Sequence, residues 1–253
     1  MTARRTVLAG LSVSLALAAA CAGPTEAAET RVAVAANFAE PAREIAARFE
    51  AATGHKAVLS FGSSGQFFAQ IANGAPFDVF LSADAERPIK AEADGLSVRG
   101  SRFTYATGRL VLWSRTPGLV DGAGAILARG GFAKLAIADP KTAPYGLAAV
   151  ETLRRLGRSE RLSPRLVTGT SITQAYQFTD TGAAELGFVA LSQVVGHNRG
   201  SRWIVPASHH SPIDQQAVLL KRGADNAAAR AFMVFLKGPE ARAIIRRYGY
   251  EVG

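Results

Sequence analysis

Small polar residues follow two buried strands of the sequence at the points where helices are expected to begin. In "AVAANFAEP", Asn37 stands between an apolar strand and a helix that starts near Phe38; in "SFGSSGQFFAQI", Ser63 and Ser64 precede another helix. Asn and Ser at such positions commonly cap the helix by accepting a backbone hydrogen bond. The same side chains and the free backbone N–H groups can instead bind an anion, which the positive end of the helix dipole favours.

Two junctions in the second half of the chain have the same design. In "IADPKTAPYGLAAVETL", Pro144 suits the first turn of a helix, where its missing N–H costs no hydrogen bond, and Tyr145 follows at once. In "VTGTSITQAYQF", Thr170 and Ser171 cap a helix whose first free N–H belongs to Ile172. None of the candidate residues is Lys or Arg. The four junctions together predict a site that binds a dianion through neutral donors and helix dipoles, with selectivity set by cavity size.

Alternating strand-like and helix-like segments from Arg31 onward predict an α/β fold of two lobes, each a mostly parallel sheet flanked by helices. We place lobe 1 at 29–106 and 216–253 and lobe 2 at 107–215, joined by crossover strands at 105–114 and 215–221. Ligands of open α/β sheets bind outside the carboxyl ends of the strands, so the four junctions should meet in the cleft between the lobes. The other expected strands are 31–36, 56–62, 77–83, 134–138, 165–169, 184–191 and 202–206, and the expected helices are 38–53, 65–73, 85–92, 145–156, 172–178, 226–236 and 239–248.

The first 28 residues have the pattern of a secretory signal peptide and are not expected to belong to the fold. Arg4 and Arg5 precede an apolar run from Val7 to Ala20, and cleavage after residue 20, 22 or 28 fits the small residues that follow. Cys21 is the single cysteine, so an intramolecular disulfide is excluded. Its position also fits a lipoprotein cysteine, and a lipid anchor at Cys21 is the alternative to its removal. Either way, the sequence predicts a periplasmic protein.

Several other function classes are not expected. The net charge is +9, but the Lys and Arg residues are scattered and no nucleic-acid-binding motif accompanies them, so we expect no nucleic acid partner. "FGSSGQ" is not the G-x-S-x-G of a hydrolase, and neither H-x-x-x-H spacing nor a phosphate-binding glycine motif is present. The acidic side chains of Asp78, Asp84 and Glu86 could be catalytic, although a helix cap is the preferred interpretation of Asp84. We therefore expect a binding protein and not an enzyme, with an extracytoplasmic hydrolase as the rival class.

Long stretches around the four junctions resemble the periplasmic molybdate-binding proteins of ABC transporters, which are type II substrate-binding proteins. The resemblance covers about 30–253 and rests on "VAVAANFAEPAREIAARFE", "SFGSSGQ", "GAPFDVFLSAD", "IADPKTAPYGLAAVETL", "AELGFVALSQV" and "LKGPEARAIIRRYGY". It implies two lobes that close by hinge bending on molybdate or tungstate, and a closed form that docks on a membrane permease. It further implies a monomer with no cofactor and no metal other than that within the oxyanion.

The resemblance also implies which residues bind the ligand. Asn37, Ser64, Tyr145 and the N–H of Ile172 fall on the family's oxyanion-binding positions, with Ala36, Ser63 and Ser171 as neighbours. Many members have a Tyr directly after the strand in "AELGFVAL", where this chain has Ala190. In another branch a Tyr at the third junction takes that role, and Tyr145 stands there. This departure places Ala190 outside the site and leaves the preference between molybdate and tungstate open, with sulfate or another anion as the alternative ligand.

Overall fold

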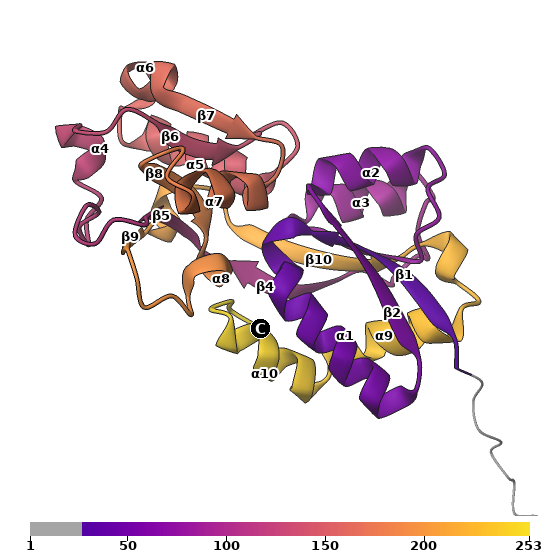
Figure 1. Ribbon diagram of the computed structural model, residues 1–253. Coiled ribbons are helices and arrows are strands. Elements are labelled where there is room, and N and C mark those ends of the chain that lie inside the picture. Colours follow the sequence, from indigo (N-terminus) through magenta and orange to yellow (C-terminus); the bar gives the residue numbers. More distant parts are fainter. Residues whose placement is uncertain (1–26) are drawn as a thin grey trace, which may run out of the picture.

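The computed structural model describes residues 27–253, which form two lobes (Figure 1). Each lobe is built on one five-stranded sheet with helices packed against it. The predicted two-lobed α/β fold is therefore confirmed. The predicted signal peptide, except for Ala27 and Ala28, lies outside the described residues, as does Cys21.

Lobe 1 combines the first third of the chain with its C-terminal part. Its elements are β1 (Glu29–Ala35), the 3-10 turn η1 (Ala36–Phe38), α1 (Ala39–Thr53), β2 (Lys56–Gly62), α2 (Ser64–Ala72), β3 (Val79–Leu81), α3 (Glu86–Ala93), β4 (Phe103–Gly108), β10 (Ile213–Leu219), the 3-10 turn η4 (Lys221–Gly223), α9 (Ala227–Lys237) and α10 (Pro239–Arg247). The strand order is β2–β1–β3–β10–β4, with β1, β2 and β3 parallel and β10 antiparallel to both of its neighbours. Helices α2 and α3 lie on one face of this sheet, and α1, α9 and α10 lie on the other (Figure 1).

Lobe 2 is the middle of the chain and repeats this plan. Its elements are β5 (Leu110–Ser114), α4 (Ile126–Arg129), β6 (Leu135–Ala138), α5 (Pro144–Arg155), α6 (Ser159–Leu162), the 3-10 turn η2 (Ser163–Arg165), β7 (Leu166–Gly169), α7 (Ile172–Asp180), β8 (Leu186–Ala190), α8 (Leu191–Val194), β9 (Ser201–Ile204) and the 3-10 turn η3 (Ala207–His209). The order is β7–β6–β8–β5–β9, with β6 parallel to β7 and β8, and β5 antiparallel to both of its neighbours. Both sheets are thus mostly parallel, each with one reversed strand.

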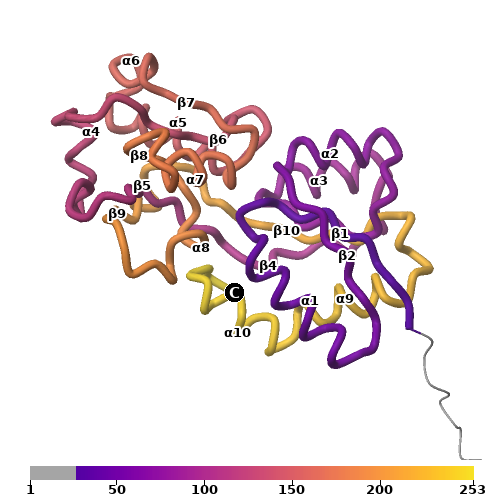
Figure 2. The backbone as a smooth tube through the Cα atoms, in the orientation of Figure 1, coloured from indigo at the N-terminus to yellow at the C-terminus, as the bar shows by residue number. Residues whose placement is uncertain are grey.

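The chain passes between the lobes twice, first from β4 to β5 and later from β9 to β10 (Figure 2). The single strand expected over 105–114 is two strands, one in each sheet, separated by Arg109. The residues 205–212 connect β9 to β10. The expected lobe limits after residues 106 and 215 fall inside β4 and β10, respectively, so the strands of lobe 1 extend slightly further than the sequence pattern indicates.

The two lobes are in close contact. Ala35, Ala36 and Ala83 of lobe 1 belong to the same buried apolar cluster as the core of lobe 2, which includes Tyr145 and Ile172. These three alanines lie at or just beyond the ends of β1 and β3. The structure is therefore a closed form, in which the strand ends of lobe 1 face the helix starts of lobe 2.

Candidate functional site

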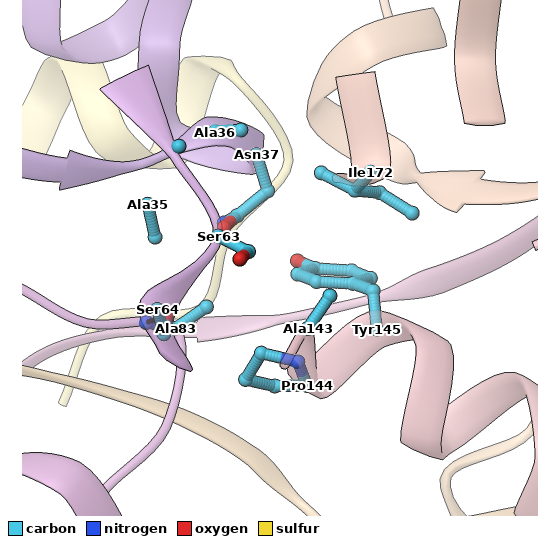
Figure 3. A pocket seen from close by; sticks show the side chains of 11 residues that line it. Ala35, Ala36, Asn37, Ser63, Ser64, Ala83, Ala143, Pro144, Tyr145 and Ile172 are labelled. Atoms are coloured by element: carbon cyan, nitrogen blue, oxygen red, sulfur yellow. Dashed lines mark hydrogen bonds between the residues drawn. The ribbon is translucent and has the colours of Figure 1, made fainter. Parts of the chain in front are cut away.

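A small cavity of about 10 Å³ lies between the lobes. Pockets for drug-sized ligands usually have about 300–1,000 Å³, so this cavity suits a small ion. Residues from lobe 1 face residues from lobe 2 across it (Figure 3). None of these described lining residues has a charged side chain; they are Ala35, Ala36, Asn37, Gly62, Ser63, Ser64, Ala83, Ala143, Pro144, Tyr145 and Ile172.

All four predicted ligand residues are among these lining residues, and each comes from one of the four predicted junctions. Asn37 lies in η1 after β1, and Ser64 is the first residue of α2 after β2. Tyr145 is the second residue of α5, and Ile172 is the first residue of α7. Their backbone N–H groups lie in the first turns of helices, which lack intrahelical acceptors and carry the positive end of the dipole.

The two serines of the second junction differ in what their hydroxyl groups do. The Ser64 hydroxyl accepts a hydrogen bond of 2.9 Å from the backbone N–H of Ala83, so its own proton is still available. The Ser63 side chain is buried, and its hydroxyl has no hydrogen-bond partner within the described part of the chain. A buried hydroxyl without a partner costs free energy, and a ligand oxygen would remove that cost. Ser63, predicted only as a neighbour, is therefore as strong a candidate ligand as Ser64.

The side-chain amide of Asn37 is already engaged within the protein. Its Nδ2 donates to Gln215 Oε1 at 2.9 Å and to the Tyr250 hydroxyl at 3.0 Å, which uses both of its hydrogens. The group left to donate to an anion is the backbone N–H of Asn37. The structure thus separates two roles, with the main chain facing the ligand and the side chain fixing the turn.

Tyr145 is 1% exposed and presents a hydroxyl that can donate. The hydroxyl accepts a hydrogen bond of 3.3 Å from Gln215 Nε2. Burial raises the pKa of Tyr145 well above its usual value of 10, so the group remains protonated at neutral pH. Gly108 provides the space for this hydroxyl, because a Cβ atom there would lie 2.1 Å from it.

The remaining predicted residues lie at or near the cavity. The Ser171 hydroxyl accepts from the backbone N–H of Gln174 at 3.3 Å, so it caps α7 and does not line the cavity. Ala36 is one of the lining residues that lobe 1 contributes. Ala190 is fully buried at the end of β8 and is not among the lining residues.

Six hydrogen bonds cross between the lobes around the cavity, and two of them are the Gln215–Tyr145 contact at 3.3 Å and the Tyr250–Ser192 contact at 2.9 Å. Gly65 N–H donates to Thr142 O at 2.8 Å, and the Ser192 hydroxyl donates to Asn37 O at 2.8 Å. The other two are longer contacts, Thr173 Oγ1 to Ala36 O at 3.4 Å and Arg87 Nη2 to Lys141 O at 3.2 Å. These bonds hold the two lobes together around the cavity.

Sequence reasoning missed the buried polar residues behind the cavity, which are Gln215, Tyr250 and Ser192. Gln215 had a signal, since a Gln inside an apolar strand must find buried partners. Tyr250 and Ser192 lie in two of the stretches that carry the resemblance, but nothing local in the sequence marks them as polar partners of the cavity residues. Their partners are 213 and 155 residues away from them in the sequence, respectively.

The acidic residues considered as catalytic have structural partners instead. Asp78 accepts from the backbone N–H of Arg31 at 2.8 Å and pairs with Arg222 at 3.0 Å. Asp84 pairs with Arg87 and accepts from its backbone N–H at 3.0 Å, as a residue preceding α3 is expected to do. Within residues 27–253, no group of three or more His, Cys, Asp or Glu side chains is placed to hold a metal ion.

An α/β protein of two lobes, closed over a small cavity lined by neutral hydrogen-bond donors, is a solute-binding protein for a small ion. Comparison with known proteins supports this class. Residues 30–251 match the family described as bacterial extracellular solute-binding protein. Over 246 residues the chain is 56% identical to the molybdate-binding protein ModA of Rhodobacter capsulatus, with 97% of each chain covered.

A second relative and a solved structure narrow the assignment. The ModA protein of Azotobacter vinelandii is 56% identical over 234 residues, which cover 91% of this chain and 92% of that one. The solved periplasmic molybdate-binding protein of A. vinelandii superimposes with a TM-score of 0.86 at 47% identity, covering 88% of this chain and 99% of that one. The chain therefore belongs to the bacterial extracellular solute-binding proteins, within the family of periplasmic molybdate-binding proteins.

This membership confirms the predicted family and places the protein in the periplasm. The relatives are named as binding proteins and not as enzymes. In the described part of the chain, no helix combines the length and the apolar character needed to cross a membrane.

Proposed function

We propose that the protein binds molybdate or tungstate in the periplasm and delivers it to the membrane permease of an ABC transporter. The names of the relatives that are 56% identical over more than nine-tenths of the chain support this ligand. The single structural observation that carries the proposal is the closed cavity lined by uncharged donors from both lobes. Such a cavity suits a small oxyanion that has left its hydration shell.

The donors are distributed so that one ligand can bridge the lobes. Lobe 1 offers the hydroxyls of Ser63 and Ser64 and the backbone N–H of Asn37. Lobe 2 offers the Tyr145 hydroxyl and the N–H of Ile172 at the start of α7. Hydrogen bonds to a charged acceptor are about twice as strong as neutral ones, and excluding water strengthens them further. Binding of the anion therefore stabilises the closed form over an open one.

Cavity size provides the selectivity in this proposal. All tetrahedral dianions offer the same four oxygens, so the donors alone do not separate them. A rigid cavity that fits the longer metal–oxygen bonds of molybdate and tungstate leaves a smaller sulfate unable to reach donors on both lobes. Unmade bonds in a dry cavity are costly, which turns a small size difference into a large affinity difference.

Calorimetric titration of the mature protein with molybdate, tungstate, sulfate and phosphate tests the proposal. Molybdate and tungstate should bind with a Kd of about 1 μM or tighter, which corresponds to roughly −8 kcal/mol. Sulfate and phosphate should bind far more weakly. Sulfate binding equal to or tighter than molybdate binding would overturn the ligand assignment and favour a sulfate-binding function.

We further propose that the mature protein acts as a monomer after removal of the signal peptide. The intact mass of the protein isolated from cells separates cleavage after Ala28 from lipid attachment at Cys21. Sedimentation of the ligand-bound protein at micromolar concentration measures the oligomeric state, and a dimer would contradict the proposed monomer.

A further inference from the structure

The C-terminal segment after α10 returns to the junction between the lobes. The chain end lies beside β4 and α8 in both views (Figures 1 and 2). The backbones of Glu251 and Thr107 exchange hydrogen bonds of 2.8 and 3.1 Å, and the Glu251 carboxylate pairs with Arg109 at 2.7 Å. Arg109 is the residue between β4 and β5, so the segment is fixed at one of the two passages between the lobes.

Tyr250, inside this segment, is buried directly behind the cavity. Its ring packs edge-on against Phe38, with centroids 5.4 Å apart. Its hydroxyl accepts from Asn37 Nδ2 at 3.0 Å and donates to Ser192 Oγ at 2.9 Å, with Asn37 O as a second acceptor at 2.7 Å. One oxygen atom therefore contacts a cavity residue of lobe 1 twice and a residue of lobe 2 once.

Ser192 is the residue of lobe 2 that contacts both Asn37 and Tyr250 of lobe 1. It lies in α8 of lobe 2, and its hydroxyl also donates to Asn37 O at 2.8 Å. Asn37 and Tyr250 both belong to lobe 1 and remain together when the lobes separate. Their contacts with Ser192 join the two lobes, so a separation of the lobes would break them.

A chain of uncharged buried groups continues from Tyr250 to the ligand side of the cavity. Asn37 Nδ2 donates to Gln215 Oε1 at 2.9 Å, and Gln215 Nε2 donates to the Tyr145 hydroxyl at 3.3 Å. Burial raises the pKa of Tyr250 to about 12, so its hydroxyl keeps its proton throughout the neutral range. The network thus joins the two ligand-facing residues Asn37 and Tyr145 to the contact between the lobes.

We propose that Tyr250 is a positioning residue that couples anion binding to lobe closure, by orienting the Asn37 turn and completing the contact with Ser192. This inference rests on the proposed anion-binding function but concerns a residue outside the cavity. Because the contact with Ser192 joins the two lobes, its removal should act mainly on the rate at which the closed complex opens and releases the ligand. Association with the open form should change little.

The test compares Tyr250→Phe with wild type in the mature protein, with molybdate as the probe. Stopped-flow measurements should show a dissociation rate about 3- to 10-fold higher, the effect of one buried hydrogen bond, and an association rate within about 2-fold of wild type. Tyr248→Phe is the matched control, because its hydroxyl contacts Glu44 of lobe 1 at 3.4 Å and reaches neither Asn37 nor Ser192. Its binding kinetics should equal those of wild type.

Ser192→Ala tests the same contact from lobe 2. It should also raise the dissociation rate, and the double variant with Tyr250→Phe should be less impaired than the product of the two single effects. An unchanged dissociation rate in Tyr250→Phe, a loss confined to the association rate, or independent effects in the double variant would each overturn the coupling. If Tyr250→Phe does not fold, as judged by thermal unfolding without ligand, Ser192→Ala decides by the same dissociation criterion.

The outcome is separable from that of the proposed ligand. If wild type prefers sulfate in calorimetry, molybdate fails as the ligand, but the same rates can be measured with sulfate. The coupling is then supported if Tyr250→Phe changes the dissociation rate and not the association rate, and refuted otherwise.

Discussion

The Tyr145 hydroxyl is the feature of the cavity whose removal gives the most direct test of the site. Tyr145→Phe keeps the ring, which is buried in the core of lobe 2, and removes only the donor. The contact that this hydroxyl makes with Gln215 Nε2 is long, at 3.3 Å. The folded protein without ligand should therefore lose little stability, on the order of 1 kcal/mol.

The effect on binding should be larger than the effect on stability. A hydrogen bond to a charged partner contributes about 1.5–3 kcal/mol, and leaving the anion without it should raise the Kd by about 10- to 150-fold. Calorimetry with molybdate measures the change directly, and urea unfolding without ligand measures the stability.

Tyr105→Phe is a matched control for this prediction. Tyr105 is also a buried tyrosine whose hydroxyl contacts Gln215, at 3.0 Å from Oε1, but it does not line the cavity. Its Kd for molybdate should stay within about 3-fold of wild type, because its hydroxyl does not line the cavity and so loses no bond to the ligand. Wild-type affinity in Tyr145→Phe, or an equal loss in both variants, would show that the Tyr145 hydroxyl does not contact the ligand.

Three further predictions concern neighbouring groups. Gly108→Ala should weaken molybdate binding at least as much as Tyr145→Phe, because the new Cβ would lie 2.1 Å from the hydroxyl; additive effects in the double variant would contradict this cause. Ser63→Ala should raise the Kd for molybdate by about 10-fold or more and leave the urea midpoint nearly unchanged, since the Ser63 hydroxyl has no partner in the described chain. Ser64→Ala should raise the Kd and also lower the urea midpoint, because the buried N–H of Ala83 loses its acceptor. The free energy of unfolding should fall as pH rises above about 10, because tyrosines of the unfolded chain then ionise while Tyr145 and Tyr250, whose pKa is raised in the folded protein, stay protonated. Each of the two contributes a fall of up to about 1.4 kcal/mol per pH unit. Urea unfolding at about pH 9 to 11 should show a shallower fall in Tyr145→Phe than in wild type, and equal slopes would refute this account.

Much of the fold was predictable because its signals are local. Apolar runs separated by helical periodicity mark the strands and helices, and helix-start residues such as Asn37, Ser64 and Pro144 mark the edge at which the cavity forms. The split of 105–114 was missed because both halves are apolar and strand-like, and only tertiary pairing assigns them to different sheets. Helices α4, α6 and α8 span four residues each, which is too short for a periodic pattern.

Of the site, only the residues that line the cavity were predictable from the sequence. Each cavity-lining candidate sits next to its own strand end, so the sequence shows it without knowledge of the packing. The assignment of roles needed the structure: the Asn37 side chain turned out to be engaged by Gln215 and Tyr250, and the free hydroxyl was that of Ser63. Hydrogen bonds between residues 178 and 213 positions apart leave no local trace in one sequence.

The absence of charge around the cavity follows from how such a protein has to work. A Lys or Arg in the described lining would be buried without a partner whenever the ligand is absent and the lobes are closed, at a cost of several kcal/mol. Hydroxyls and backbone N–H groups carry a much smaller cost when unpaired, about 1–3 kcal/mol each. That smaller cost is enough to disfavour closure without a ligand, because it adds up over Ser63, Tyr145 and the helix starts. A neutral cavity therefore makes closure conditional on the anion and still lets the lobes reopen to release it.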